Sequence, residues 1–123
     1  MTRRELIELC LAHAGVYEDY PFDEIADENA WTVMRHRSSR KSFAFIFERE
    51  GLCINLKCEP VKGDHLRQLF DAVTPAYHMN KTHWITVRPD GDVSQELLEE
   101  LIDHSYDLTA KKQKKQVAEK DPV

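Results

Sequence analysis

The first helical pattern of apolar residues begins at the start of the chain. Thr2 and Glu5 have the spacing of a capping box, in which the Thr2 hydroxyl accepts a backbone N–H of the first turn and Glu5 bonds back to the Thr2 N–H. The apolar positions that follow at helical spacing are Leu6, Leu9, Cys10 and Ala14. Because Gly15 tolerates the left-handed conformation that ends helices, the pattern predicts a helix between Thr2 and Gly15.

Two further helical patterns lie in the second half of the chain. Pro60 stops the preceding strand pattern, and Asp64 is a good N-cap for a helix. The apolar residues of this helix, at i, i+3, i+4 and i+7, are Leu66, Leu69, Phe70 and Val73. Ser94 is the expected N-cap of the last helix, and Val93 and Leu98 fit a hydrophobic staple. The buried side of that helix is predicted to be Leu97, Leu98, Leu101, Ile102 and Ser105.

Four stretches alternate in the manner of strands: residues 31–37, Ser42–Glu48, Leu52–Lys57 and 84–88. The second stretch is apolar on both faces, which is typical of a central strand that is covered on both sides. Its predicted faces are Phe43, Phe45 and Phe47 on one side and Ala44 and Ile46 on the other. Short connections between the first three stretches predict an antiparallel meander.

The predicted order of elements is α-β-β-β-α-β-α. Runs of strands with hairpin links, set between helices, are typical of α+β folds, so we expect one antiparallel sheet with helices packed on one face. Residues 1–109 contain no repeat and no linker, and we interpret them as a single domain. Beyond Thr109 the chain is rich in Lys and Gln, with Val117 and Val123 as its large apolar residues. We expect residues 110–123 to form a flexible tail.

The charge distribution narrows the classes of partner. The formal net charge is −5. Five of the 17 basic residues and two of the 22 acidic residues lie in residues 110–123, which leaves residues 1–109 with 12 basic and 20 acidic residues and a net charge of −8. Neutralising nucleic-acid phosphates requires a surplus of Lys and Arg at the interface. An acidic body is therefore a poor general polyanion binder, and any contact with nucleic acid has to be local.

Composition is that of an ordinary globular protein, with 41% hydrophobic and 32% charged residues among 123. We find no apolar run of membrane-spanning length, and the first 20 residues are charged and amphipathic rather than a signal peptide, so no membrane partner is expected. Three cysteines, Cys10, Cys53 and Cys58, are too few and odd in number for a disulfide framework. We expect a cytoplasmic protein.

Residues 75–84 gather ring and donor side chains between a predicted helix and a predicted strand. Tyr77, His78, Asn80 and Lys81 are the candidate ligand-binding residues, because Lys81 supplies a point charge with three donors and the Asn and Tyr side chains add direction. Such a loop suits a small anion or the edge of a planar ligand. The alternative is that Tyr77 folds into the core and Lys81 is simply solvated.

Residues 35–41 form a second candidate site at the tip of a predicted hairpin. Arg35, Arg37, Arg40 and Lys41 are its candidate nucleic-acid-binding residues, because a basic hairpin tip can follow a DNA backbone or enter a groove while phosphate contacts fix its register. The alternative is a solvated turn that keeps a sheet edge soluble.

The sequence lacks the residue patterns that are typical of metal sites and of enzyme active sites. His78 and His83, even with Cys58 or His65, do not have a zinc-site spacing. We find no nucleophile elbow, phosphate-binding glycine loop or zinc-protease motif. We therefore expect no catalytic residue, no metal and no cofactor, and a non-enzymatic protein.

Several motifs occur in an order that resembles a known family. They are Tyr20-Pro21-Phe22, Phe43-Ala44-Phe45-Ile46, Lys57 with Pro60, the run of residues 75–84, Asp90-Gly91 and Ser105-Tyr106-Asp107-Leu108. With them, residues 2–109 resemble the MmcQ/YjbR family of small bacterial proteins. The resemblance implies a CyaY-like (frataxin-like) fold and DNA binding.

Two functional hypotheses remain. The first is local DNA contact through the hairpin 35–41, which the resemblance favours and the acidic body limits. The second is a non-enzymatic module that binds a small anionic ligand or a protein partner at the loop 77–84.

Overall fold

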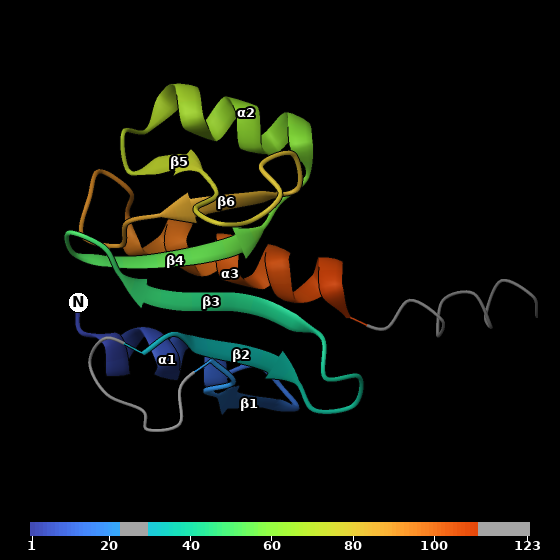
Figure 1. The fold of residues 1–123 in the computed structure, drawn as a ribbon. Coiled ribbons are helices and arrows are strands. Elements are labelled where there is room, and N and C mark those ends of the chain that lie inside the picture. The colour runs from blue at the N-terminus through green and yellow to red at the C-terminus, as the bar shows by residue number, and fades with distance from the viewer. Residues whose placement is uncertain (23–29, 111–123) are drawn as a thin grey trace, which may run out of the picture.

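The computed structural model describes residues 1–22 and 30–110. The elements of this part, in chain order, are α1 (Arg3–Leu11), β1 (Val16–Asp19), β2 (Thr32–His36), β3 (Ser42–Glu48), β4 (Leu52–Lys57), α2 (Pro60–Leu69), β5 (Val73–Pro75), β6 (Trp84–Val87) and α3 (Gln95–Thr109). The strands form one six-stranded sheet in the order β1-β2-β3-β4-β6-β5, and each neighbouring pair is antiparallel (Figure 1).

The helices cover one face of this sheet. α3 packs against β3 and β4, and α1 packs against β1, β2 and β3 (Figure 1). α2 packs on β5 and β6, where a Cβ added to Gly63 would lie 3.3 Å from Cγ2 of Ile85. The prediction of an α+β fold with an antiparallel sheet and helices on one face is therefore confirmed. The finer expectation of a CyaY-like fold stays a prediction.

The predicted starts of the first and last helices are confirmed. Thr2 Oγ1 accepts the Glu5 N–H at 3.1 Å, and the Thr2 N–H donates to the Glu5 carboxylate at 2.8 Å, so the capping box is complete. Ser94 Oγ accepts the Leu97 N–H at 3.0 Å at the start of α3. These caps satisfy N–H groups that have no partner inside the helix.

The second helix differs from its predicted position. It begins with Pro60 in its first turn and ends at Leu69, so Asp64 lies inside the helix instead of capping it. Pro60 is compatible with this start because the first residues of a helix do not need their N–H groups for helical bonds. Val73 is not part of the helix but opens β5, where it pairs with Val87. Leu69, predicted to be buried, is 72% exposed.

The observed order α-β-β-β-β-α-β-β-α corrects the predicted order by adding β1 and β5. Both strands lie at the edges of the sheet, and they contain four and three residues. So short a segment carries too few alternating positions to be recognised, and its pairing partner decides its conformation. β1 pairs with β2, and β5 pairs with β6.

The strand β3 contains an irregularity that reverses part of its alternation. The register of β2 and β3 shifts at Phe43, which has no partner residue on β2. The extra residue of a β-bulge turns its side chain out of the normal alternation. Phe43 consequently packs against Tyr106 of α3, whereas Phe47 stacks on Trp31 at the opposite face. The predicted common face of Phe43, Phe45 and Phe47 is therefore wrong.

The described part of the chain ends where α3 ends. Ala110 is the C-cap of α3, and the predicted flexible tail otherwise falls on residues 111–123, outside the described residues. Among the helices of residues 1–22 and 30–110, none combines the length and the apolar character that crossing a membrane requires.

Candidate ligand-binding site

Two buried polar side chains hold the backbone of Tyr77 against the sheet. The amide of Asn55 on β4 donates to the Tyr77 carbonyl at 2.9 Å, and the Tyr77 N–H donates to the Thr86 hydroxyl on β6 at 2.9 Å. The Thr86 hydroxyl in turn donates to the side-chain carbonyl of Asn55. Asn55 is 0% exposed and Thr86 is 4% exposed, so water does not replace these bonds. The network fixes where the chain leaves the sheet after β5.

The loop of residues 76–83 closes on itself through two of the predicted ligand-binding residues. Asn80 Oδ1 accepts the N–H groups of Thr82 at 2.8 Å and His83 at 3.1 Å, as in an Asx turn. The Lys81 ammonium donates to the Ala76 carbonyl at 2.8 Å. Both contacts shape the loop from within.

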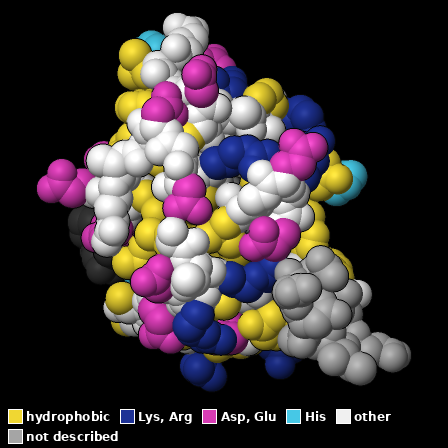
Figure 2. Space-filling view, turned by 90° about the vertical axis from the view of Figure 1, so that its left-hand side faces the viewer, with side chains coloured by type: hydrophobic (Ala, Val, Ile, Leu, Met, Phe, Trp, Pro, Cys, Tyr) yellow, Lys and Arg dark blue, Asp and Glu magenta, His cyan; other side chains and the backbone are white. Residues whose placement is uncertain are grey.

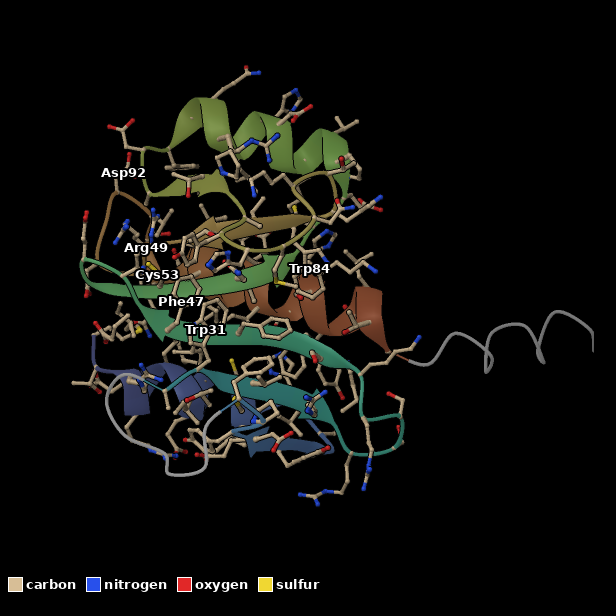
Figure 3. The ribbon with its side chains drawn as sticks, in the orientation of Figure 1. Trp31, Phe47, Arg49, Cys53, Trp84 and Asp92 are labelled. Carbon is tan, nitrogen blue, oxygen red and sulfur yellow. The ribbon has the colours of Figure 1, made fainter. Side chains whose placement is uncertain are left out.

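Aromatic rings cover the sheet face that lies opposite α1 and α3. Trp31 stacks on Phe47 with ring centroids 4.2 Å apart and planes 6° apart. The Tyr77 ring lies 5.6 Å from that of Phe47 and 6.3 Å from that of Trp31. Figure 3 shows Trp31 and Phe47 together over β3. With the helices on its other side, β3 is covered on both faces, as its apolar sequence predicts.

A pocket of about 300 Å³ opens beside the Tyr77 ring, and we call it the cationic pocket. Its lining residues are Phe47, Arg49, Cys53, Thr74, Pro75, Ala76, Tyr77, Lys81, Thr86 and Arg88. Three of them are cations and none is a carboxylate. The Arg49 guanidinium lies 4.1 Å from the Tyr77 ring centroid, and Arg88 donates to the Glu50 carbonyl at 3.0 Å. Arg49 and Cys53 lie side by side in Figure 3.

The thiol in this pocket is not activated. Cys53 is 1% exposed, and burial raises the pKa of its thiol, while Arg88 and Arg49 oppose that shift. A thiol with a raised pKa is protonated at neutral pH, and the thiolate is the form that acts as a nucleophile. Cys53 therefore serves as part of the pocket wall.

A second pocket of about 390 Å³ lies next to the first, and we call it the aromatic pocket. Phe22, Trp31, Phe45, His78 and Met79 line it. Phe22 meets Trp31 edge to face with ring centroids 6.4 Å apart, although its side chain is 64% exposed. His78 has a φ of 63°, a conformation that costs energy for any residue except glycine. The strained backbone holds the His78 ring 4.0 Å from that of Tyr77.

Two of the four candidate residues in the hairpin 35–41 are engaged with the rest of the sheet. Arg35 donates from Nε to the Asp19 carboxylate on β1 at 2.8 Å. The Arg37 guanidinium lies 5.3 Å from the centroid of the Tyr17 ring. Arg37 is an exposed residue, whereas Arg35 is half-buried.

The other two residues occupy the tip of the hairpin. Arg40 and Lys41 are both exposed, and Arg40 has a φ of 66°. The turn between β2 and β3 projects beyond the adjacent strands (Figure 1). Arg37, Arg40 and Lys41 therefore form the accessible part of the hairpin.

Charge on the molecular surface is mixed. On the face shown in Figure 2, acidic and basic side chains are interspersed, with hydrophobic atoms between them. Ion pairs also occur among the surface charges of the described residues, as between Arg4 and Glu18 at 3.0 Å. Anion contact is thus favoured at particular points on this surface rather than across it.

The metal-ligand candidates do not converge in the part of the chain that the structure describes. Within residues 1–22 and 30–110, no three His, Cys, Asp or Glu side chains are grouped so that they could hold a metal ion. His78 lines the aromatic pocket, and His83 donates its N–H to Asn80.

Comparison with known proteins identifies the family. The YjbR family model matches residues 11–108, which is most of the chain. The chain belongs to the YjbR family. The resemblance to MmcQ/YjbR proteins is thereby confirmed.

The similar proteins named here carry no stated activity. Uncharacterized protein YjbR of Escherichia coli K12 is 33% identical over 107 residues, which cover 86% of this chain and 85% of that protein. Uncharacterized protein YbdF of Escherichia coli O157:H7 is 43% identical over 68 residues, about half of each chain at 52% and 56%. A crystal structure of a Deinococcus radiodurans protein is similar with a TM-score of 0.76 and 36% identity, covering 91% of this chain and 80% of that one.

The structure of this YjbR-family protein brings three of the four candidate loop residues to a pocket. Tyr77 and Lys81 line the cationic pocket, and His78 lines the aromatic pocket. Asn80 lines neither of the two and forms the turn instead. Lys81 is exposed beside its bond to the Ala76 carbonyl.

Four residues of the site are missing from the sequence-based candidates. Arg49 and Arg88 each directly follow a strand, a position that suits many surface arginines. Asn55 and Thr86 each lie between apolar neighbours in their strands, and a polar residue at such a position is the signal that points to a buried hydrogen-bond network. Their partner, the Tyr77 backbone, is set by the tertiary structure.

Proposed function

We propose that this protein binds a small organic anion in the cationic pocket, and that it acts as a binding module without catalytic chemistry. The observation that carries the proposal is the lining of the pocket, where Arg49, Lys81 and Arg88 occur without a carboxylate. Cations gathered in this way repel one another, and an anionic ligand converts that repulsion into attraction. Residues 1–109 carry a net charge of −8, so a pocket lined by three cations and no carboxylate differs in charge from the rest of the domain.

The origin of the three cations supports a built binding site. Arg49 directly follows β3, Lys81 belongs to the loop 76–83, and Arg88 directly follows β6. Side chains from separate segments approach a ligand from several sides. Guanidinium groups match the geometry of carboxylate and phosphate, and the ammonium adds a compact charge. The volume of about 300 Å³ is at the lower end of ligand sites, so the anion is small.

The chemistry of the pocket supports binding rather than catalysis. The Cys53 thiol is protonated, and neither a histidine nor a carboxylate lines the pocket as a general base. We place the protein in the cytoplasm, because Cys10, Cys53 and Cys58 are buried free thiols of the kind that a reducing compartment preserves.

Calorimetric titration with orthophosphate and with small carboxylates tests the proposal. Lys81→Met keeps the aliphatic stem but removes the charge, and it is expected to weaken anion binding by about tenfold or more. Lys62→Gln on α2 removes the same charge away from the pocket and is expected to leave the affinity unchanged. Failure of every one of these anions to bind the unaltered protein would overturn the proposal.

A second candidate function is local DNA contact through the hairpin 35–41. It is favoured by the exposure of Arg37, Arg40 and Lys41 on a projecting turn, and by the family resemblance. Fluorescence anisotropy with a short duplex at two salt concentrations tests it. Arg40→Gly combined with Lys41→Gln is the suitable variant, because glycine accepts the positive φ of Arg40 and the fold is preserved. No binding of the unaltered protein at low salt would exclude this function.

A further inference from the structure

We infer that the anion bound in the cationic pocket carries a planar ring, and that this ring occupies the aromatic pocket. The inference rests on the proposed anion-binding function and specifies its ligand class: an aromatic phosphate ester or an aromatic carboxylate. It follows from three features: the two pockets are neighbours, the rings that line the aromatic pocket are arranged to contact a further ring, and the cationic pocket is positively charged.

The two pockets are neighbours separated by one layer of rings. Tyr77 lines the cationic pocket, while Trp31 and His78 line the aromatic pocket. The Tyr77 ring centroid lies 4.0 Å from that of His78 and 6.3 Å from that of Trp31. The distance between the pockets is therefore within the reach of a single small molecule, which would pass beside the Tyr77 ring, because the Arg49 guanidinium lies over that ring at 4.1 Å. Each pocket alone is near the lower limit for a ligand site.

The walls of the aromatic pocket suit a flat ring better than a flexible chain. Trp31 meets Phe22 at an interplanar angle of 83° and Phe45 at 67°, so ring edges and ring faces border the same space. Aromatic groups favour edge-to-face and offset contacts of this kind. Phe22, at 64% exposure, presents apolar surface that residues 1–22 and 30–110 leave uncovered.

The rings are held in place before any ligand binds. The backbone of Tyr77 is fixed by Asn55 and Thr86, and the Trp31 ring is stacked on the buried Phe47. His78 keeps its ring beside Tyr77 although its φ of 63° is unfavourable. Ordering these groups therefore costs little at the moment of binding, and this preorganisation increases affinity.

Charge complementarity selects one type of occupant. A wholly apolar ligand would leave the cations of the neighbouring pocket with their neutral partners, the Ala76 and Glu50 carbonyls and the Tyr77 ring, and without a counter-charge. An inorganic anion would leave the aromatic pocket empty. A ring that bears a phosphate or carboxylate satisfies both at once, because stacking and ion pairing act at opposite ends of the same molecule.

Paired probes that differ only in the ring test the inference by NMR titration of backbone amides. Phenyl phosphate is compared with n-butyl phosphate, and benzoate with hexanoate, with orthophosphate as the anion alone. We expect the aromatic member of at least one pair to bind about tenfold tighter than its aliphatic partner. Its shift changes are expected at Trp31 and His78 as well as at Lys81, whereas orthophosphate is expected to shift Lys81 and its neighbours.

Variants separate the two ends of the site. Phe22→Ala and His78→Gly are expected to reduce aromatic-anion affinity to that of the aliphatic partner, and to reduce it by more than they reduce orthophosphate affinity; glycine accepts the φ of residue 78. Lys81→Met is expected to weaken binding of every anion, while Val61→Ala, an exposed apolar residue on α2, and Lys62→Gln change none of them.

The outcomes distinguish the inference from the function on which it rests. If the aliphatic members bind as tightly as the aromatic ones in both pairs, the ring inference is overturned and the anion-binding proposal stands. If orthophosphate and all four organic anions fail to bind, the anion-binding proposal falls, and the ring inference falls with it.

Discussion

Thr86 joins the sheet to the binding loop through its hydroxyl. It accepts the Tyr77 N–H and donates to Asn55, and the side chains of Thr86 and Asn55 are both buried. Thr86→Val keeps the shape but leaves the Tyr77 N–H and the buried Asn55 carbonyl without this partner, which we expect to lower the free energy of unfolding by about 1–3 kcal/mol. Urea denaturation measures the change. Thr74→Val, at the exposed position that pairs with Thr86, is the matched control and should cost little.

An equal midpoint of urea denaturation for Thr86→Val and Thr74→Val would contradict the structural role of this network. The Thr86 variant also bears on the pocket, since Thr86 lines it. Because Thr86→Val removes the hydrogen bond to the Tyr77 backbone, we expect this variant to bind the ligand more weakly as well as to unfold more easily.

We expect His36 to make the stability of the fold depend on pH. Its side chain is 5% exposed and Nε2 lies 2.8 Å from the Thr109 hydroxyl of α3. Burial lowers the pKa of His36 below the ordinary value of 6.5, and the nearby Lys41 lowers it further. The unfolded chain then takes up a proton more readily than the folded protein, so stability is full above pH 6.5 and falls as the pH drops toward the folded-state pKa.

The expected measurement is a series of urea midpoints between about pH 7.5 and 5. The unaltered protein should lose stability across this range, and His36→Gln should lose less. The pKa of His104 is lowered in the same direction, by burial and then by Lys62, so part of the pH dependence is expected to remain. Identical pH profiles for the two proteins would show that His36 titrates alike in both states.

At the scale of elements, Ser105 joins α3 to two strands. Its hydroxyl donates to the Phe43 carbonyl of β3 at 2.6 Å and accepts the Lys57 N–H of β4 at 2.8 Å. The bulge at Phe43 and the end of β4 thereby find a partner outside the sheet ladder. Helix and sheet are tied at the point where regular strand pairing stops.

Ser105→Ala is expected to destabilise the protein by about 1–3 kcal/mol, because it leaves the buried Phe43 carbonyl and the partly buried Lys57 N–H without this partner. Asp107→Ala, on the exposed side of the same helix, is the control for helix propensity. Thermal unfolding of both variants measures the difference. Equal stability of the two would mean that apolar packing alone holds α3 on the sheet.

The helices and strands also differ in how well the local sequence predicts where they begin and end. The ends of α1 and α3 were predictable, because the capping side chains of Thr2 and Ser94 bond within one turn. The start of α2 was not, since Pro60 both stops a strand and suits a first helical turn. β1 and β5 are strands because β2 and β6 offer them hydrogen bonds.

At the scale of the whole molecule, the acidic body limits what the hairpin can do. A net charge of −8 on residues 1–109 repels a polyanion at long range, and the exposed cations Arg37, Arg40 and Lys41 act against it locally. Each phosphate contact contributes about −0.9 to the slope of log affinity against log salt concentration.

The slope for duplex DNA is therefore expected to be shallow, about −3 at most if each of the three cations meets one phosphate. Arg40→Gly with Lys41→Gln should reduce its magnitude by about 2. Anisotropy titrations over a range of salt concentrations give both values. If the slope is steep and the double variant does not change it, DNA binds at another surface and the proposed contact through the hairpin is wrong.

The sequence by itself determined the local features of this protein: the caps, the apolar stripes, the central double-faced strand and the family. Each of these depends on residues that are close together in the chain or on motifs in a fixed order. Only the tertiary structure decided the side on which Phe43 packs, the strands at the sheet edges, and the meeting of Arg49, Lys81 and Arg88 around one pocket. The physical reason is that strand pairing and register bring these residues together, and no local pattern encodes which distant partner a residue meets.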